Sequence, residues 1–248
     1  MNEEYRKLLS LVKHSNNIVF FGGAGVSTAS GIPDFRGNGG LYRIGNEICV
    51  PPETLLSYGY FRSYPDRFYK YYRANMLYPD AKPNAAHYAL ARLEEMGKLK
   101  AVITQNIDGL HQAAGSKTVY ELHGSVTKNY CMKCGKHHSL RYITEADGVP
   151  LCLNCGGVVR PDVVLYGESL NASVWLDAEE SIMNADLFIV AGSSLTVTPA
   201  ADLVPLYSGN SLVIINYSET RYDGIADLII RDSVADVLDS IINKLPES

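Results

Sequence analysis

The sequence predicts an α/β protein built around a doubly wound parallel sheet. Short apolar runs, typical of buried strands, alternate along the chain with stretches in which apolar residues recur at helical spacing. A turn rich in glycine follows the first of these runs, and later runs end in polar or small residues. Strands that alternate with helices imply parallel pairing, with the helices packed on the faces of the sheet.

The expected elements follow from these patterns. Apolar runs predict strands at residues 18–21, 101–103, 119–122, 163–165, 187–191, 212–215 and 228–230. Helices are predicted at residues 3–14, from 84 to a stop at 97, around 171–184, and from about 234 to 244. Residues 38–83 are rich in tyrosine and turn residues, which favours short helices joined by loops. A connection of this length between two strands is usually functional.

Composition argues against several classes of protein. The 248 residues, 46% hydrophobic and 20% charged, are enough for one large domain with a smaller inserted module. The net charge of −5 argues against a direct nucleic-acid partner, because phosphate binding needs a concentrated basic surface. No apolar run approaches the roughly 20 residues of a membrane span, and the N-terminus lacks the pattern of a secretory signal. We therefore expect a cytoplasmic monomer without membrane contact.

Four cysteines in two close pairs predict a metal site. Cys131-x2-Cys134 and Cys152-x2-Cys155 are separated by seventeen residues, which is the spacing of a structural zinc ribbon. Four thiolates fill a tetrahedral Zn²⁺ site and leave no position for water, so the ion is expected to hold a module together rather than to catalyse. Two disulfides are the alternative, although disulfides are rare in cytosolic chains. Cys49 is left over and is expected to be a small buried residue.

The glycine-rich turn predicts a phosphate-binding loop. Gly22, Gly23 and Gly25 directly follow the first apolar run, and glycines let a pyrophosphate approach the backbone N–H groups. Thr28 stands where the third glycine of the G-x-G-x-x-G pattern would fall, which disfavours an ordinary dehydrogenase. Residues 33–37 then place an acid, an aromatic ring and a guanidinium in one loop. A plain surface turn is the alternative for that loop.

Polar residues follow two other predicted strands. Gln105, Asn106 and Asp108 come after the run at 101–103, and His123 directly follows the run that ends at residue 122. Ligands of open α/β sheets bind at the carboxyl ends of the strands, so these side chains are expected at one sheet edge. Imidazole titrates near neutrality, which makes His123 the candidate base. A histidine with a structural role is the alternative.

Together these segments resemble the sirtuins, the family of NAD-dependent protein-lysine deacylases. The matching motifs follow one another in sirtuin order, and they are Gly23-Ala24-Gly25-Val26-Ser27, Gly31-Ile32-Pro33-Asp34-Phe35-Arg36, Thr104-Gln105-Asn106-Ile107-Asp108, His123-Gly124, the four cysteines, Arg160-Pro161, Gly167-Glu168, Gly192-Ser193-Ser194 and Asn216. The resemblance implies a Rossmann-like NAD-binding domain made of residues 1–37, 84–125 and 161–248. It also implies a smaller lobe, formed by a helical insert at 38–83 and the zinc ribbon at 126–160.

The resemblance also assigns roles to residues. His123, Asn106 and Asp108 would be catalytic, with Asn106 and Asp108 in the pocket for nicotinamide and His123 as the base that deprotonates a ribose hydroxyl. The NAD-binding residues would be Ala24, Gly25, Thr28, Phe35, Arg36, Gln105, Ile107, Asp108, His123, Gly192, Ser193, Ser194, Asn216 and Val234. The acyl-lysine protein or peptide would pair as an added strand with Val164, Leu165, Tyr166 and Gly167.

The choice of acyl group depends on the helical insert. Family members specialised for acidic acyl groups carry Tyr-x-x-Arg there and an alanine at the position of Thr28. This chain has Tyr69-x-x-Tyr72, with Arg73 one place later. We therefore predict an acetyl-lysine substrate, with succinyl or longer acyl groups and mono-ADP-ribosyl transfer as alternatives. A different class of function, that of a zinc-ribbon interaction protein, is disfavoured by the intact polar residues at 105–108 and 123.

Overall fold

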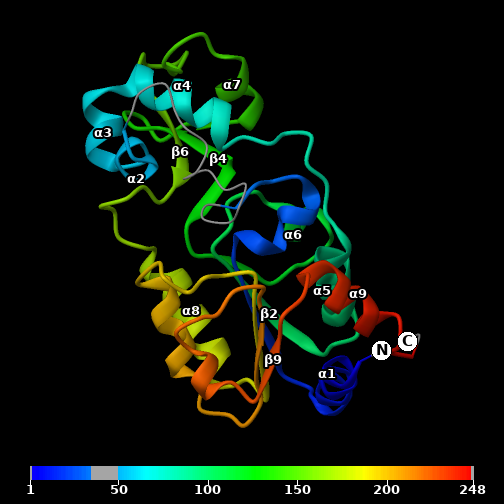
Figure 1. Ribbon diagram of the computed structural model, residues 1–248. Coiled ribbons are helices and arrows are strands. Elements are labelled where there is room, and N and C mark those ends of the chain that lie inside the picture. The colour runs from blue at the N-terminus through cyan, green and yellow to red at the C-terminus, as the bar shows by residue number, and fades with distance from the viewer. Residues whose placement is uncertain (1, 35–49, 247–248) are drawn as a thin grey trace.

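A six-stranded parallel sheet forms the core of the larger lobe. Its strands lie in the order β3-β2-β1-β7-β8-β9, and every neighbouring pair is parallel. They are β1 (Ile18–Gly22), β2 (Leu99–Thr104), β3 (Val119–Glu121), β7 (Leu187–Ala191), β8 (Leu212–Ile215) and β9 (Leu228–Ile230). The computed structural model describes residues 2–34 and 50–246 (Figure 1). The predicted doubly wound parallel sheet is confirmed.

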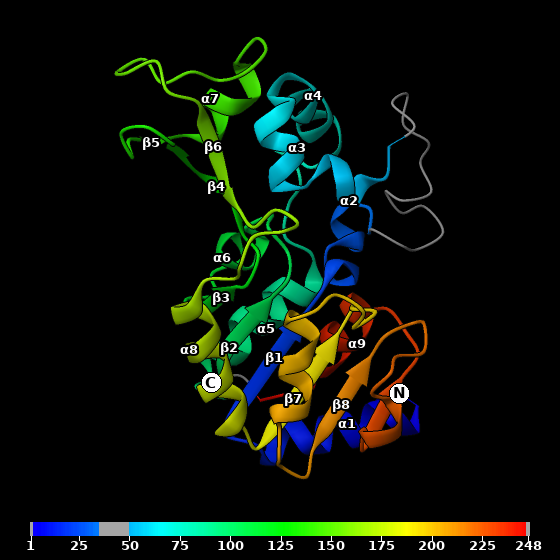
Figure 2. The ribbon, with the colours of Figure 1, turned by 90° about the vertical axis from the view of Figure 1, so that its left-hand side faces the viewer.

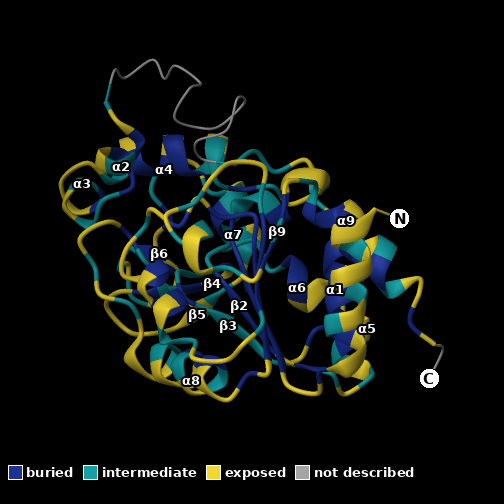
Figure 3. Cartoon of the chain, turned by 60° about the horizontal axis from the view of Figure 1, so that its bottom comes forward, coloured by how far each residue is buried: buried dark blue, intermediate teal, exposed yellow. Residues whose placement is uncertain are grey.

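Helices cover both faces of this sheet. One face packs against α1 (Glu3–His14), α5 (Ala85–Glu95) and α9 (Val234–Ile242), and the other against α8 (Ala172–Met183) and the 3₁₀ helix η3 (Ala200–Leu206). Successive strand residues point to opposite faces, so Phe20 belongs to the first cluster and its neighbour Phe21 to the second. Burial on both faces explains why the strands are continuous apolar runs. Figure 3 shows the strands as the buried centre, with exposed residues on the outer sides of the helices.

The smaller lobe combines a second sheet with short helices. Its three strands, β4 (Gly124–Cys131), β5 (His137–His138) and β6 (Val159–Val163), pair antiparallel in the order β5-β4-β6. The helices are α2 (Pro52–Leu55), α3 (Tyr58–Ser63), α4 (Pro65–Asn75) and α7 (Leu140–Glu145). Buried aromatic side chains from α3 and α4 pack against the sheet in one hydrophobic cluster. Figure 2 shows α3 and α4 beside β4 and β6. The short helices predicted for residues 38–83 are therefore present in the part from residue 50 onward.

The predicted strand at residues 163–165 is wrong. The strand at this place is β6, which runs from Val159 to Val163, and Val163 pairs with Gly124 of the small sheet instead of joining the parallel sheet. A three-residue apolar run carries no periodicity that identifies its partner strand. The residues that follow Val163 form a loop. The short 3₁₀ turn η4 (Asp223–Ile225) is a further connection that the sequence patterns did not indicate.

Within residues 2–34 and 50–246, no helix has the length and apolar character needed to span a membrane.

Two histidines from the helices α5 and α6 (Leu110–Ala113) are buried side by side. His87 of α5 and His111 of α6 are 0% and 1% exposed, and their ring centroids lie 4.7 Å apart. The backbone N–H of Asn84 donates to Nδ1 of His87 at 3.2 Å. Burial lowers the pKa of His87 to about 4. Burial, together with the charge of His87, lowers the pKa of His111 to about 3, so both rings are neutral in the folded chain near pH 7.

This pair is expected to make the fold sensitive to acid. The unfolded chain takes up these two protons near the ordinary histidine pKa of about 6.5, whereas the folded chain takes them up only near pH 4 and 3. The stabilising contribution is thus complete above pH 6.5 and is lost progressively as the pH falls below that value. Urea unfolding between pH 7.5 and 5 measures it. A His87→Gln/His111→Gln variant should have a shallower decline in the free energy of unfolding.

The exposed His14 of α1 provides the control. A His14→Gln variant should keep the pH dependence of the wild type, because its ring is on the surface. Parallel curves for the wild type and the double variant would show that the buried pair does not carry the acid sensitivity.

Candidate functional site

A cavity of about 830 Å³ lies at the carboxyl ends of the central strands, beside the small lobe. The strand order reverses between β1 and β7, and such a switch point is where open α/β sheets bind ligands. Except for the cysteines, the predicted site residues that the structure describes all line this cavity, and they are Ala24, Gly25, Thr28, Gln105, Asn106, Ile107, Asp108, His123, Val164, Leu165, Tyr166, Gly167, Gly192, Ser193, Ser194, Asn216 and Val234. Phe35, Arg36 and Cys49 lie outside the described residues, and the individual roles of the others stay predictions.

The glycines after β1 bring two turns into contact. The N–H of Gly25 donates to the carbonyl of Gly192 at 2.8 Å, and a Cβ added to Gly25 would lie 2.7 Å from the Cα of Gly192. Gly192 itself has a φ of +61°, a left-handed conformation that favours glycine. After this contact the chain forms two short 3₁₀ turns, η1 (Ala24–Val26) and η2 (Thr28–Ser30). These glycines thus allow the backbones of the turns after β1 and β7 to come into contact. This is in addition to the predicted approach of phosphate.

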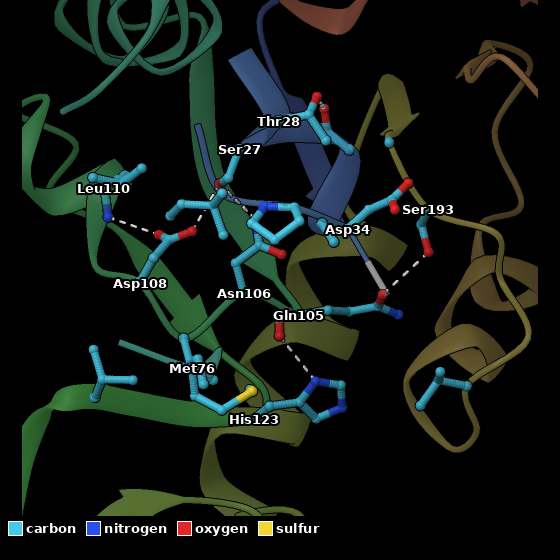
Figure 4. Close-up of a pocket in the computed structure, with 18 of the residues that line it drawn as sticks. Ser27, Thr28, Asp34, Met76, Gln105, Asn106, Asp108, Leu110, His123 and Ser193 are labelled. Carbon is cyan, nitrogen blue, oxygen red and sulfur yellow. Dashed lines mark hydrogen bonds between the residues drawn. The ribbon is translucent and has the colours of Figure 1, made fainter. Parts of the chain in front are cut away.

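A polar network joins the turn after β1 to the residues after β2. The hydroxyl of Ser27 donates to Asp108 Oδ2 at 2.7 Å and accepts a hydrogen bond from Asn106 Nδ2 at 3.0 Å (Figure 4). Asn106 Nδ2 also donates to the carbonyl of Gly23, and the N–H of Leu110 donates to Asp108 Oδ1. Burial raises the pKa of Asp108, against the opposing effect of these hydrogen bonds. The network fixes the orientation of the amide and the carboxyl group.

Sequence reasoning missed Ser27 as the centre of this network. Its only signal was its place at the end of the glycine motif, because the residues that it joins lie 79 and 81 positions further along the chain. Met76, the C-cap residue of α4, was also missed and lines the same cavity as His123 (Figure 4).

A hydrogen bond to the ring of His123 defines which ring nitrogen carries the proton. Its Nδ1 lies 3.0 Å from the carbonyl oxygen of Gln105. A carbonyl can only accept, so this contact requires the proton on Nδ1 and leaves Nε2 as the basic nitrogen. Burial lowers the pKa of His123, with the hydrogen bond to Gln105 acting in the opposite direction. Figure 4 places the ring on the same cavity as Asn106 and Asp108. Because its pKa is lowered, the ring is neutral near pH 7 and able to accept a proton.

Gln105 presents an unused donor at the cavity. Its Oε1 accepts a hydrogen bond from the hydroxyl of Ser193 at 3.1 Å, and that hydroxyl in turn accepts from the N–H of Leu195 at 3.2 Å. Its Nε2 is buried and has no partner among the residues that the structure describes. A buried donor without a partner costs about 1–3 kcal/mol, which a ligand oxygen can recover.

The four cysteines of the small lobe form one cluster. Their sulfur atoms all lie within 4.8 Å of one another, with Cys131–Cys155 at 3.4 Å and Cys134–Cys152 at 3.8 Å. A Zn–S bond of about 2.3 Å places the sulfurs of a tetrahedral site about 3.8 Å apart, so the cluster fits such an ion. None of the four is in a disulfide, which contradicts the alternative interpretation of the spacing. Two of them, Cys131 and Cys152, are buried in the core of the small lobe.

The structure directs Arg73 away from the cavity. Its Nε donates to the carbonyl of Ile143 at 2.8 Å, and its Nη2 donates to the carbonyl of Gly148 at 2.6 Å. Arg73 therefore joins α4 to the zinc-ribbon module, and it does not line the cavity, whereas Tyr72 does.

Comparison with known proteins agrees with this architecture. A sequence profile of the Sir2 family matches residues 23–199. The NAD-dependent protein deacetylase of Clostridium acetobutylicum is 53% identical over 241 residues, covering 97% of this chain and 98% of that protein. The enzyme of the same name from Clostridium perfringens is 54% identical over 244 residues, covering 98% and 100%. A solved Sir2–p53 peptide–NAD⁺ complex superposes with a TM-score of 0.87 at 41% identity and covers 98% of each chain. The chain belongs to the Sir2 family, as its sequence motifs predicted.

Proposed function

We propose that this chain is an NAD-dependent protein-lysine deacetylase, which transfers the acetyl group of acetyl-lysine to ADP-ribose and releases nicotinamide. The observation that carries the proposal is the position of His123, Asn106 and Asp108 on one cavity with the glycine turn, at the switch point of the sheet. The deacetylases that are about half identical to the chain over nearly its whole length support it. When bound, NAD supplies the acyl acceptor and a leaving group.

The residues around the cavity fit such a dinucleotide. The turns at Gly25 and Gly192 carry no side chains where their backbones meet, and Ser193, Ser194 and Asn216 offer polar groups beside them. The orphan Nε2 of Gln105 supplies a donor for a ribose hydroxyl. Asn106 and Asp108, fixed through Ser27, supply polar partners for a carboxamide.

His123 has the form that a base needs. Because Nδ1 donates to the carbonyl of Gln105, Nε2 is left to take a proton from a hydroxyl, and the lowered pKa keeps the ring neutral at working pH. The resulting imidazolium would be stabilised by the same carbonyl. Apolar residues such as Ile107 and Val126 also line the cavity.

The zinc ion is proposed to be structural. The four sulfurs would complete its coordination, so that no position is left for a reacting group. Its place beside the core of the small lobe supports a role in holding β4, β6 and α7 against the helices of the insert. A structural ion in the small lobe agrees with the division of the chain that the sequence predicts. We therefore propose a NAD-binding domain (1–37, 84–125 and 161–248) and a small lobe (38–83 and 126–160).

Acetyl-lysine is expected to be a better substrate than succinyl-lysine. No arginine among the described residues lines the cavity, because Arg73 is bound to the carbonyls of Ile143 and Gly148. Turnover on matched acetyl- and succinyl-lysine peptides with NAD, followed by mass spectrometry, should give a kcat/KM at least about tenfold higher for acetyl, which corresponds to about 1.4 kcal/mol. The reason is that the succinyl carboxylate would find no arginine partner among the described residues of the cavity.

The same assay tests the function itself. O-acetyl-ADP-ribose should accumulate together with the deacetylated peptide and nicotinamide. Faster removal of succinyl would refute the acetyl preference. Transfer of ADP-ribose onto protein with no deacylated peptide would refute the deacetylase and favour a mono-ADP-ribosyltransferase.

A further inference from the structure

A loop at residues 164–168 connects the candidate base to the helical insert. The N–H of Val164 donates to the carbonyl of His123 at 2.9 Å. The N–H of Tyr166 donates to the carbonyl of Leu56, and the carbonyl of Tyr166 accepts from the N–H of Tyr58, both at 3.0 Å. Each residue of the loop also lines the cavity. Its backbone conformation therefore shapes one wall of the site.

The side chain of Arg160 fixes this loop through hydrogen bonds. Arg160 belongs to β6 and is 6% exposed. Its Nη1 and Nη2 donate to Glu168 Oε1 and Oε2 at 2.7 and 2.8 Å, the paired geometry that only a planar guanidinium can make. Nη2 also donates to the carbonyl of Val163 at 2.9 Å, and Nε to the carbonyl of Pro161 at 3.1 Å. The guanidinium is thus bonded to both ends of the loop.

Glu168, the last residue of the loop, is hydrogen-bonded to the backbone of Leu165. Its Oε2 accepts the N–H of Leu165 at 2.9 Å, and its own N–H donates to the carbonyl of Leu165 at 2.9 Å. Burial would raise the pKa of Glu168, but the hydrogen bonds from Arg160 and Leu165 outweigh it and hold that pKa below its usual value. Leu165 and Tyr166 therefore have their backbone groups occupied, whereas the N–H and C=O of Gly167 have no partner among the described residues.

Aromatic rings surround the guanidinium of Arg160, whose side chain is 7% exposed, whereas that of Glu168 is 23% exposed. The rings of Tyr58, Phe61 and Tyr130 are centred 5.8, 5.6 and 5.9 Å from Cζ of Arg160. An ion pair that is largely removed from solvent adds little to stability when compared with apolar packing, so its conformational role is the more informative one. Here that role is to fix a stretch of backbone at the cavity.

We propose that Arg160 and Glu168 are positioning residues for the acyl-lysine peptide, which they serve by fixing the 164–168 loop so that its open backbone groups at Gly167 can pair with the peptide. This inference rests on the proposed function. Neither residue belongs to the turns at Gly25 and Gly192, which line the proposed NAD end of the cavity. Disturbing it should weaken the binding of peptide and leave the binding of NAD unchanged.

Conservative substitutions at the two positions test the proposal. Glu168→Gln keeps the shape and loses the charge, and Arg160→Lys keeps the charge and loses the paired geometry. Each should raise the KM and the Kd for an acetyl-lysine peptide by about tenfold, the effect of one disrupted buried hydrogen-bonded group. The KM for NAD and the kcat at saturating peptide should stay near their wild-type values. The double variant should be no worse than either single one, because both remove the same contact.

The exposed pair Arg141–Glu145 of α7 is the matched control. Its Nε–Oε1 distance is 2.7 Å, like the buried pair, but its side chains are 81% and 61% exposed. Arg141→Lys and Glu145→Gln should leave every constant unchanged. Fluorescence anisotropy with a labelled acetyl-lysine peptide gives Kd without turnover, and thermal unfolding verifies that each variant is folded at the assay temperature.

The outcomes separate the two claims. Equal rises in KM for peptide and NAD, unchanged peptide binding, additive effects in the double variant, or unfolding of both single variants would each overturn the positioning role. A wild-type protein that binds the peptide but does not deacetylate it would refute the proposed function, and the Kd values of the variants would still decide the role of the pair.

Discussion

His123→Ala is expected to lower kcat for deacetylation by about 10²- to 10⁴-fold, the usual contribution of a positioned general base. The substitution removes Nε2, the only nitrogen that the hydrogen bond between Nδ1 and Gln105 leaves free to accept a proton. The polar network of Ser27, Asn106 and Asp108 does not include His123, so NAD binding and the fold should be retained. Steady-state turnover with acetyl-lysine peptide, together with NAD titration and thermal unfolding, measures these effects.

His137→Ala is the matched control for this variant. His137 is an exposed residue of β5 in the small lobe, and its removal should leave kcat near the wild-type value. The lowered pKa of His123 also predicts that the acid limb of the wild-type rate profile falls below pH 6.5, because the base is active when neutral. Near-wild-type turnover by His123→Ala would exclude the ring as the base.

Loss of the metal is expected to unfold the small lobe. Structural Zn²⁺ contributes about 10–16 kcal/mol in small zinc modules, which exceeds the stability of most domains. Cys131 and Cys152 are 1% and 2% exposed and share a cluster with Ile143 and Val159. Cys131→Ser, or treatment with a strong chelator, should therefore expose this core and abolish deacetylation. Hydrogen exchange followed by mass spectrometry should show lost protection in β4 and β6, with the parallel sheet still protected.

Cys49→Ser leaves the four-cysteine cluster complete and serves as the control for this variant. It should retain one equivalent of zinc, as measured by elemental analysis, and wild-type exchange protection. Full activity and protection after complete removal of zinc would contradict a structural role for the ion.

The parallel sheet was predictable because its signal is local. Strands buried on both faces, such as Ile18–Gly22 and Leu187–Ala191, are apolar throughout and end abruptly in polar or small residues. The position of His123 and Asp108 at one edge followed from the rule that parallel strands share their carboxyl ends. The cysteine spacing likewise identified the cluster without knowledge of the intervening helix α7.

Contacts between distant segments were not predictable from these patterns. Val163 gave no indication that it pairs with Gly124, since three apolar residues suit either sheet. The bond between Tyr166 and Leu56 joins segments 110 positions apart, and it is made by backbone atoms that carry no sequence signal. Arg160 and Glu168 were noticed as motif residues, but only their distances reveal that they form one pair. Sequence reasoning thus located the site more readily than it located the residues that support it.

The backbone bonds of the 164–168 loop make the two lobes mechanically dependent. One bond attaches the loop to His123 beside the parallel sheet, and two attach it to Leu56 and Tyr58 of the insert. A hinge rotation of the insert would therefore pull directly on the peptide unit of His123. Closure of the two lobes around a bound ligand would then also reorient the imidazole of His123, in one and the same movement.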